Sequence, residues 1–511
     1  MPITDAGKLG GMTGVPATLR AGQESRAKMG DFNAQVRETH TGIVFLVGDK
    51  AYKAKKPLTT DFLDFSTPEC RERACQDEVA LNRRLAPDSY LGVAHFSGPG
   101  DGPAEPVIVM RRYPDDTRLA SLAKNNEPVH HHLCVIAEKL ARFHKDATRG
   151  RAIDAEGKAR AVSARWQQNL LELERNSGGI IPRDSIGEAA RLATRFISGR
   201  GPLFAQRIAE RRIVDGHADL LADDIFCMPD GPALLDCLEF DSHLRYVDGI
   251  DDAAFLAMDL EFLGRKELGD HFLDEYRRRA DDPAPRSLAD FYIAYRAVVR
   301  AKVDCIRVTQ GHRDAAADAC RHIDIALEHL RASTVRLIVI GGGPGTGKTT
   351  LSQALAQEIG AQVISTDDVR RELQQSGAIT GRVGELDVGL YRPENVSKVY
   401  DEVLRRARLS LSGGSSVILD GTWRDAHQRE RARHVADETV STIVEFTCSV
   451  PLEQASGRIK DRPASSSDAT PEIAAALGEF DTESFGTYHI DTSRSLADSV
   501  AEVQKTCRRA I

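Results

Sequence analysis

The sequence predicts two domains, an α+β unit followed by an α/β unit built on a parallel sheet. The chain has 511 residues, which exceeds one typical domain. At Val335 the pattern changes abruptly, because apolar strands then alternate with helical segments, as is typical of a parallel sheet. Before that residue, strands and long helices follow in separate blocks. We expect domains at 34–332 and 333–511, after a loosely ordered segment at 1–33 that is rich in Gly, Ala and small polar residues.

Composition and charge exclude several classes of protein. A net charge of −8 argues against nucleic acid or an anionic membrane as the main partner. There is no run of about 18 apolar residues that would span a membrane, and the N-terminus lacks the apolar region of a signal peptide. Nine scattered cysteines without a C-x-x-C pair are typical of reduced thiols. The expected location is therefore the cytoplasm.

The elements of the first domain follow from local patterns. Residues 42–57 predict a β-hairpin around the turn Gly48-Asp49. A hydroxyl cap at 66–67 followed by Pro68 predicts a helix that runs to about Leu85. Residues 105–113 form a further apolar strand. Helical patterns cover 129–211 and 253 to about 331, with an acid-rich, loop-rich segment at 215–252 between them.

A phosphate-binding motif opens the second domain. Residues 342–349 fit G-x-x-x-x-G-K-[ST], follow an apolar strand and precede a helix. Such glycines let backbone N–H groups face a phosphate, next to the positive end of a helix. Lys348 would reach the β- and γ-phosphates and Thr349 would ligate Mg²⁺. The predicted cofactors are ATP and Mg²⁺, and the predicted nucleotide-binding residues here are Gly342, Gly343, Pro344, Gly345, Thr346, Gly347, Lys348, Thr349 and Thr350.

Further polar residues follow in the order that phosphoryl transfer needs. Asp420 ends the apolar strand 416–419 and would be a second holder of Mg²⁺. Asp367 and Asp368 are expected to end another strand, at the carboxyl edge where open α/β sheets bind ligands; capping of the next helix is the alternative. Arg458 and Arg462 precede a Ser-rich stretch at 463–472 that we expect to be mobile, and they would stabilise phosphoryl charge unless they belong to a solvated helix face.

The segment 335–511 resembles the small P-loop kinases that include zeta toxins, gluconate kinase and polynucleotide kinase. The resemblance is carried by GGGPGTGKTT, STDDVRREL, LDGTW and the R-x-x-x-R spacing of Arg458 and Arg462. It implies that Asp367 orients or deprotonates the acceptor hydroxyl. It does not specify the acceptor.

An acidic loop in the first domain carries a second set of candidates. In GHADLLADDIF, residues 216–226, Asp224 comes five positions after Asp219, and a short hairpin pattern then leads to Asp236. This is the layout of a kinase catalytic loop, in which a base aspartate precedes two metal ligands. Acids that only make turn bonds are the alternative. We expect His217 to support the loop, and Asp223 has no assigned role.

Two upstream residues complete that layout. Lys53 lies on the second strand of the hairpin in an A-x-K pattern, and Glu78 lies on the following helix. A strand lysine held by a helix glutamate grips nucleotide phosphates in such enzymes. Lys55, on the same strand face, is the fallback. A solvated edge strand rich in lysine is the alternative.

These pieces resemble the aminoglycoside phosphotransferase and choline kinase branch of the protein-kinase-like fold, in actinobacterial-type proteins that fuse it to a P-loop kinase. ETHTGIVFLVGDKAYKAKKP, LDFSTPE, LNRRLAPDSYLGV, GHADLLADDIF, LDCLEFD and AAFLAMDLE carry the resemblance. It implies a two-lobed fold, with Asp219 as catalytic base, Asp224 and Asp236 as Mg²⁺ ligands, and Lys53 on the phosphates.

The sequence departs from that branch at three points. Ala218 replaces a usual Gly, which we expect to be sterically acceptable, and Asp224 replaces a usual Asn. A G-x-G-x-x-G loop is missing, with only Gly42 near that turn.

The function predicted is an ATP-dependent phosphotransferase with two kinase-like units that act on hydroxyls of small polar acceptors. One alternative is a nucleotide-binding regulatory protein with a degenerate kinase-like module. Another is a toxin- or repair-like kinase that acts on a nucleotide sugar or a polynucleotide 5′-hydroxyl. The acidic net charge disfavours nucleic acid as the acceptor.

Overall fold

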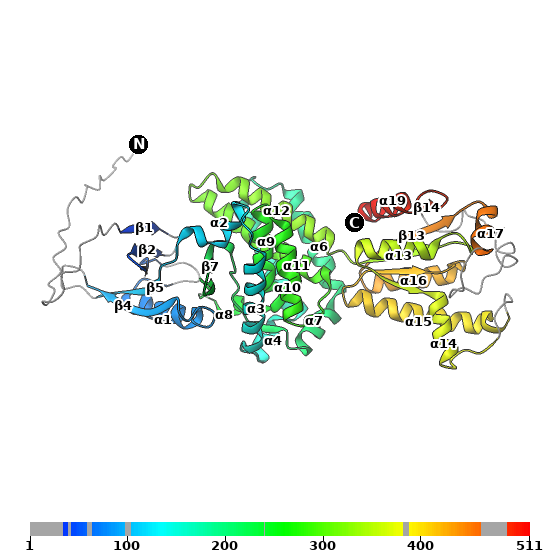
Figure 1. Ribbon diagram of the computed structural model, residues 1–511, viewed down its shortest axis with the longest axis horizontal. Coiled ribbons are helices and arrows are strands. Elements are labelled where there is room, and N and C mark those ends of the chain that lie inside the picture. The colour runs from blue at the N-terminus through cyan, green and yellow to red at the C-terminus, as the bar shows by residue number, and fades with distance from the viewer. Residues whose placement is uncertain are drawn as a thin grey trace, which may run out of the picture.

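A computed structural model describes residues 34–38, 42–58, 64–97, 104–239, 241–381, 388–460 and 488–510. The predictions for 1–33, Arg462 and 463–472 therefore lie outside the described residues. The described chain forms three bodies in a row: a sheet lobe, a helical lobe and an α/β domain (Figure 1). The first two make up the N-terminal domain, so the predicted fold class of two mixed α/β domains is confirmed.

The sheet lobe is a five-stranded antiparallel sheet in the order β1-β2-β3-β5-β4. Its strands are β1 (Gln35–Glu38), β2 (Gly42–Val47), β3 (Lys50–Lys55), β4 (Tyr90–Phe96) and β5 (Glu105–Arg111). Helix α1 (Pro68–Asn82) packs on β4 and β5. The Thr67 hydroxyl accepts a hydrogen bond from the Cys70 N–H, as predicted for the cap, but the helix ends at Asn82 and not at Leu85. Because β3 is the central strand, its lysines are not on a solvated edge.

The helical lobe follows the sheet lobe along the chain. Its helices are η1 (Asp115–Thr117), α2 (Leu119–Lys124), α3 (His130–Asp146), α4 (Arg151–Glu156), α5 (Ala159–Ser177), α6 (Arg183–Gly199), α7 (Gly201–Ala209), η2 (Ala222–Asp224), α8 (Ser242–Arg245), α9 (Gly249–Phe262), α10 (Lys266–Arg279), α11 (Arg286–Thr309) and α12 (Ala315–Ala332). Two antiparallel strand pairs lie between α7 and α9. They are β6 (Ile213–Asp215) with β9 (Tyr246–Asp248), and the predicted hairpin of β7 (Ile225–Met228) with β8 (Gly231–Leu234).

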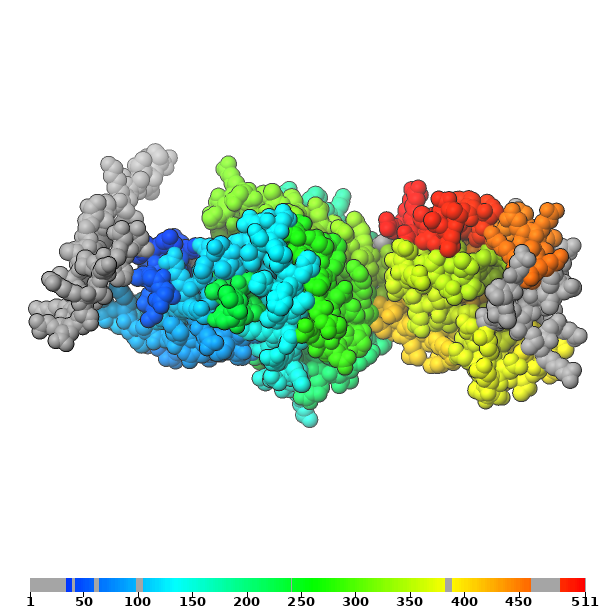
Figure 2. All heavy atoms as spheres, in the orientation of Figure 1, coloured from blue at the N-terminus to red at the C-terminus, as the bar shows by residue number. Residues whose placement is uncertain are grey.

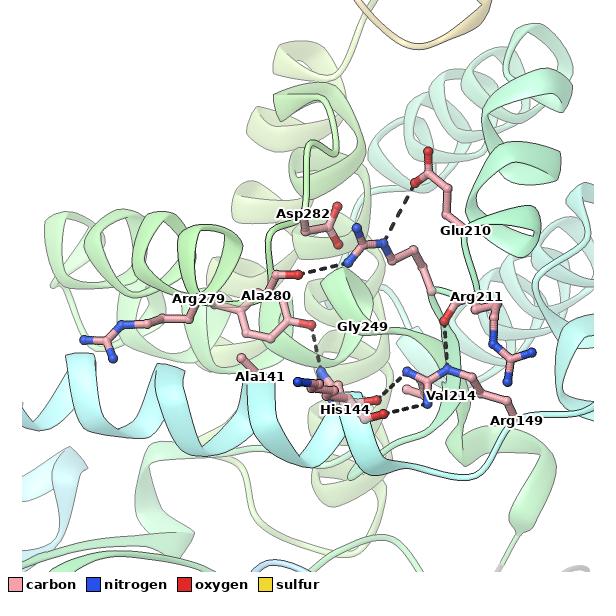
Figure 3. Close-up of a pocket in the computed structure, with 13 residues that line it drawn as sticks. Ala141, His144, Arg149, Glu210, Arg211, Val214, Gly249, Arg279, Ala280 and Asp282 are labelled. Atoms are coloured by element: carbon pink, nitrogen blue, oxygen red, sulfur yellow. Dashed lines mark hydrogen bonds and ion pairs between the residues drawn. The ribbon is translucent and has the colours of Figure 1, made fainter.

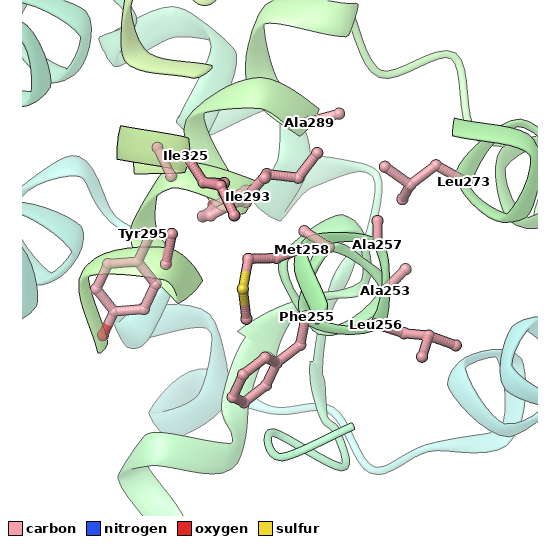
Figure 4. Close-up of a cluster of buried hydrophobic side chains, with 14 of the residues drawn as sticks. Ala253, Phe255, Leu256, Ala257, Met258, Leu273, Ala289, Ile293, Tyr295 and Ile325 are labelled. Atoms are coloured by element: carbon pink, nitrogen blue, oxygen red, sulfur yellow. The ribbon is translucent and has the colours of Figure 1, made fainter. Parts of the chain in front are cut away.

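Helix α9 lies at the centre of the helical lobe. Residues 249–258 are all buried, and Phe255, Leu256 and Met258 pack among side chains of α10, α11 and α12 (Figure 4). A helix that is apolar on every side needs this position. Its first turn nevertheless carries two buried acids, Asp251 and Asp252. Buried carboxylates require hydrogen-bond partners, and these partners turn out to belong to the acidic loop and its supports.

The C-terminal domain contains a five-stranded parallel sheet in the order β11-β12-β10-β13-β14. Its strands are β10 (Arg336–Gly341), β11 (Gln362–Ser365), β12 (Val417–Asp420), β13 (Thr442–Ser449) and β14 (Tyr488–Asp491). Its helices are α13 (Lys348–Ile359), α14 (Thr366–Gln375), η3 (Gly389–Tyr391), α15 (Pro393–Ser412), α16 (Ala426–Glu438), α17 (Leu452–Lys460) and α19 (Leu496–Arg509). Two apolar cores cover the two faces of the sheet, one under α14, α15 and α16 and the other under α13 and α19.

The two domains meet where the molecule is narrow (Figure 2). The buried guanidinium of Arg200 donates a 2.8 Å hydrogen bond to the carbonyl of Thr439, and Ser287 Oγ donates a 2.6 Å bond to the carbonyl of Gly414. Thr439 and Gly414 precede β13 and β12, so the helical lobe covers the amino ends of these parallel strands. The carboxyl ends, where ligands bind in such sheets, face away from the helical lobe.

No helix in the part of the chain that the structure describes is long and apolar enough to cross a membrane. All nine cysteines are free thiols.

Candidate active sites

Lys53 and Glu78 form an ion pair between β3 and α1. Lys53 Nζ lies 2.8 Å from Glu78 Oε1, and the Glu78 side chain is fully buried. The second carboxylate oxygen of Glu78 lies 2.5 Å from Lys55 Nζ, which also contacts Glu239 Oε1 at 2.8 Å. Glu78 therefore contacts Lys53, as predicted from the sequence, and also contacts Lys55, which was considered only as a replacement for Lys53. Burial alone would lower the pKa of Lys53, but the carboxylates of Asp236 and Glu78 hold that pKa above its ordinary value.

Asp236 brings the acid-rich segment to that ion pair. It lies just after β8, and its Oδ1 is 2.8 Å from Lys53 Nζ, 183 residues away in the chain. Its φ of 63° is left-handed, a conformation that Asp tolerates better than most residues. Lys53 lowers the pKa of Asp236, so this carboxylate is ionised. Its side chain is 43% exposed, so it remains available to a ligand at the junction of the two lobes.

The acidic loop places Asp219 and Asp224 beside Asp236. Burial raises the pKa of Asp219 to about 7. Burial also raises the pKa of Asp224, with further contributions from Asp236 and Asp219. Asp236 disfavours the charged forms of both Asp219 and Asp224, and carboxylates crowded in this way fit a site built for a cation. Asp223, by contrast, is exposed, and its carbonyl accepts a hydrogen bond from Arg118.

The protein alone does not form a complete metal site. Over the described ranges, no three His, Cys, Asp or Glu side chains are arranged as a metal-binding cluster. Mg²⁺ is ordinarily held by one or two carboxylates, with water and substrate phosphates as the remaining ligands. Asp224 and Asp236 are therefore the residues that would hold Mg²⁺ here.

Three residues that the sequence analysis left without a role hold the acidic loop from behind. Asp252 accepts 2.7 Å hydrogen bonds from the backbone N–H groups of His217 and Ala218. His144 Nε2 lies 2.8 Å from the same carboxylate, and its Nδ1 lies 2.7 Å from the Tyr276 hydroxyl. All three side chains are buried. The signal in the sequence was an acid in the first turn of an otherwise apolar helix, which must find partners.

His217 and Ala218 adopt the conformation that this support imposes. His217 is fully buried, its Nε2 lies 3.1 Å from the Leu235 carbonyl, and burial lowers its pKa, so it is neutral. Ala218 has φ 67°, and its carbonyl accepts a hydrogen bond from Arg296. The prediction that a Cβ is sterically acceptable here rested only on the space available for the methyl group. The methyl group does fit, but the left-handed backbone favours Gly, so Ala218 is strained.

The phosphate motif forms a loop between β10 and α13. Gly342 has φ 136° and Gly345 has φ 75°, and a Cβ on either would lie 2.5 Å from a backbone oxygen, that of Cys448 or Ala455. Glycine is therefore required at both positions. Lys348, the first residue of α13, donates a 2.8 Å hydrogen bond from Nζ to the Gly343 carbonyl. The loop, the lysine and the helix N-terminus form a phosphate-binding arrangement.

Thr349 and Asp420 meet beside this loop. Thr349 Oγ1 donates a 2.8 Å hydrogen bond to Asp420 Oδ2, across 71 residues of chain. The other oxygen, Asp420 Oδ1, is buried and makes no hydrogen bond. Burial raises the pKa of Asp420. A hydroxyl next to an unsatisfied carboxylate oxygen fits a Mg²⁺ site completed by water and phosphate. Thr350, also predicted to bind nucleotide, is exposed on the same helix turn.

Asp367 and Asp368 lie in the first turn of α14 and not at the end of the strand. The capping residue is Ser365, whose hydroxyl accepts from the N–H groups of both aspartates, so the capping alternative is also wrong. Asp367 Oδ1 lies 2.5 Å from Arg370 Nη1, and both aspartates add to the negative field at Asp420. Asp368 is the more exposed of the two, at 56% of its side chain.

Arg458 is held against the phosphate loop. It lies on α17 and donates a 2.9 Å hydrogen bond to the Thr492 carbonyl, while Thr492 Oγ1 donates to the Thr346 carbonyl at 2.7 Å. Arg458 Nη1 would lie 3.4 Å from a Cβ on Gly347. Its partner in the R-x-x-x-R spacing, Arg462, lies outside the described residues.

Together these features define a two-domain protein, with a two-lobed protein-kinase-like domain followed by a P-loop NTPase domain. A family model described as an AAA domain matches residues 337–481. Over 476 residues the chain is 57% identical to the uncharacterized protein Rv2004c of Mycobacterium tuberculosis (strain ATCC 25618 / H37Rv), which covers 93% of this chain and 96% of the relative. The chain belongs to the family of that mycobacterial protein.

More distant similarities cover only parts of the chain. An adenylate kinase of Phocaeicola vulgatus is 30% identical over 128 residues, which are 24% of this chain and 66% of that kinase. Among solved structures, a choline/ethanolamine kinase family protein from Mesorhizobium loti aligns with 59% of this chain and 94% of its own, at 15% identity and a TM-score of 0.37.

Proposed function

We propose that this protein is an ATP-dependent phosphotransferase with two independent kinase sites, each transferring the γ-phosphoryl group to a hydroxyl of a small polar acceptor. The observation that carries the proposal is that residues suited to phosphoryl transfer come together in two separate places in one chain. Lys53, Glu78 and Asp236 are joined at 2.8 Å in one domain, and Thr349 joins Asp420 at 2.8 Å in the other. Neither set shares a residue with the other.

In the N-terminal site the residues divide the work of phosphoryl transfer. Lys53, fixed by Glu78, would hold the nucleotide phosphates. Asp219 would accept the proton of the acceptor hydroxyl, and its raised pKa of about 7 suits a general base at neutral pH. Mg²⁺, when held by Asp224 and Asp236, supplies charge neutralisation at the phosphates.

In the C-terminal site the phosphate loop and Lys348 would hold the nucleotide, and Thr349 and Asp420 would hold Mg²⁺. Asp367, which contacts Arg370, would orient or deprotonate the acceptor hydroxyl. Arg458 would stabilise charge on the transferred group. The similarity to adenylate kinase supports a nucleotide-dependent kinase of this class, and a cytoplasmic location fits a use of ATP.

The two sites are far apart, which supports independent reactions. The helical lobe contacts the C-terminal domain at the amino ends of β12 and β13, whereas the phosphate loop and Asp420 lie at the carboxyl ends. A product of one site would have to diffuse through solvent to reach the other.

A degenerate, regulatory N-terminal module is the second candidate. Two observations favour it: the strained Ala218 in the acidic loop, and Asp224, whose burial raises its pKa so that its charge is disfavoured without a cation. This candidate predicts nucleotide binding by the N-terminal site without turnover.

The test is transfer from γ-labelled ATP to a panel of sugars, amino alcohols, nucleosides and nucleoside monophosphates. We expect products that depend on Asp219 and others that depend on Lys348. Two kinases are supported if one group of products is lost only in Asp219→Asn and the other group is lost only in Lys348→Ala. Transfer that survives both substitutions together would contradict the proposal. Nucleotide binding with no Asp219-dependent product supports the regulatory candidate.

A further inference from the structure

A basic cavity of about 400 Å³ lies behind the acidic loop, away from both nucleotide sites (Figure 3). It is enclosed by the C-terminal ends of α3 and α10 and by the segment that leads into β6. Its volume is within the range of small-ligand sites. The charged residues that carry the argument are the basic Lys145, Arg149, Arg211 and Arg212 and the acidic Glu210 and Asp282.

Lys145, Arg149 and Arg211 lack counterions among the described residues, whereas Arg279, which also lines the cavity, is paired with Glu138 and Glu275. Arg149 donates to the carbonyls of His144 at 2.6 Å, Ala147 at 2.7 Å and Arg211 at 2.9 Å, which fixes its position without neutralising it. Burial lowers the pKa of Arg149, and the positive charge of the nearby Arg211 lowers it further. Lys145 and Arg211 are exposed, and neither forms an ion pair with any residue that the structure describes.

The two acids do not offset these charges. Asp282 lies 2.5 Å from the buried Arg207, which uses both of its oxygens. The nearest Glu210 oxygen is 3.8 Å from Arg212 Nε, and that buried nitrogen makes no hydrogen bond. An excess of positive charge therefore faces the cavity.

The end of α7 brings two arginines to the cavity. Arg211 has φ 58°, the left-handed conformation that is common just after a helix. Its N–H donates to the Ile208 carbonyl and the N–H of Arg212 donates to the Arg207 carbonyl, both at 2.9 Å, which closes the helix. Arg211 and Arg212 both line the cavity, and Figure 3 shows Arg211 next to Arg149.

The wall of the cavity is part of the support of the acidic loop. His144 and Tyr276 line it, and their hydrogen bonds lead to Asp252 and from there to the backbone of His217 and Ala218. A ligand in the cavity would thus lie one hydrogen-bonded chain away from Asp219.

We propose that this cavity is a binding site for a small anion that carries a phosphoryl or pyrophosphoryl group. A tetrahedral dianion can accept hydrogen bonds from several guanidinium and ammonium groups at once, which a single carboxylate cannot. The site is separate from the two nucleotide sites, and its occupation orders the support of the acidic loop.

The test is a calorimetric titration of inorganic pyrophosphate, without divalent metal, into the full chain carrying Lys348→Ala. That substitution removes the phosphate-loop contribution, and without metal the carboxylates of the N-terminal site repel the probe. We expect saturable binding that weakens with salt. Adding Lys145→Ala and Arg211→Ala, both at exposed positions, should weaken it by about tenfold or more.

The matched control adds Lys124→Ala and Arg313→Ala instead, which remove the same two charges from exposed positions of the same lobe. This variant should bind as the Lys348→Ala chain does. Absence of pyrophosphate binding in the Lys348→Ala chain, or an equal loss in the control, would overturn the site.

Amide hydrogen exchange tests the effect of the ligand on the acidic loop, separately from whether the ligand binds in the cavity. Pyrophosphate should slow exchange of the His217 and Ala218 amides by several-fold in the Lys348→Ala chain and not after Lys145→Ala and Arg211→Ala are added. Binding with unchanged exchange at these amides would refute the effect on the loop while leaving the site itself intact.

Discussion

Asp252 Oδ1 lies 2.7 Å from the backbone nitrogen of Ala218, one residue before the candidate base Asp219. The same carboxylate holds the N–H of His217, so a buried acid on the central helix fixes the backbone that positions Asp219. Burial alone would raise the pKa of Asp252, but its hydrogen bond from His144 holds that pKa below its usual range. The loop is therefore attached to the most buried helix of the domain.

Asp252→Asn should destabilise the N-terminal domain. An amide can accept at one position only, so a buried N–H of the loop is left unsatisfied, at a cost of about 3 kcal/mol in the free energy of unfolding. Denaturant unfolding measures this. The control, Asp274→Asn, changes a side chain that is 78% exposed and should stay within about 0.5 kcal/mol. Equal stabilities of the two variants would refute the support role.

Ala218→Gly should leave the protein as stable as it was or more stable, by up to about 1 kcal/mol. The substitution relieves the left-handed strain at φ 67°, which outweighs the entropy gained by the unfolded chain. Ala317→Gly, at an exposed position in α12, should instead cost about 1 kcal/mol. Thermal unfolding compares the two, and a loss of stability in Ala218→Gly similar to that in the helix contradicts the strain.

Glu78→Ala should be more damaging than Lys53→Ala. Without Glu78, two lysines remain close together with Lys55 buried, at a cost of about 3–5 kcal/mol. Without Lys53, Glu78 keeps its 2.5 Å contact with Lys55. Urea midpoints of the two variants give the comparison. The reverse order would show that Lys55 is not a true partner of Glu78.

Asp219→Asn should become increasingly stabilising as pH rises from 4 to 7. The folded-state pKa of about 7 exceeds the unfolded value of about 3.9, so the folded wild type binds the extra proton and loses stability across that window. The amide cannot ionise and avoids the loss, a difference on the order of 2 kcal/mol above pH 7. Unfolding at several pH values without nucleotide tests this. A pH-independent difference between the two proteins contradicts the raised pKa.

Thr349→Val should reduce the enhancement of nucleotide binding by Mg²⁺ in the C-terminal site by at least about tenfold, because its hydroxyl is removed from Asp420. Thr350→Val changes an exposed neighbour in the same helix turn, and it should retain the enhancement by Mg²⁺ whatever its effect on nucleotide affinity itself. Titrations with and without Mg²⁺ in an Asp219→Asn background separate the two. Similar losses would argue for disruption of the helix and not of a metal site.

Local patterns were sufficient to predict much of this molecule. The phosphate motif, the strand that precedes it and the helix that follows are adjacent in sequence, so residues 335–359 could be read directly. The β2–β3 and β7–β8 hairpins follow from short-range turn signals. The family resemblance supplied the pairing of Lys53 with Glu78, whose 25-residue separation is beyond any local rule.

Contacts between distant elements could not be predicted in the same way. Asp252, His144 and Tyr276 lie on three helices, up to 132 residues apart, and only the packed lobe brings them together. The strain at Ala218 is a backbone property, whereas the sequence analysis considered only the volume of its side chain. Ser365 was overlooked as a helix cap because two acids follow after one intervening residue and are also good capping residues.

The number of nucleotides bound per chain is the most direct test of two separate nucleotide sites, which two independent kinase reactions require. Equilibrium dialysis with a non-hydrolysable ATP analogue and Mg²⁺ should give two per wild-type chain, one in Lys348→Ala, one in Lys53→Ala and none in the double variant. A single nucleotide per wild-type chain that disappears in Lys348→Ala would contradict the proposal, because the N-terminal domain would then bind no nucleotide.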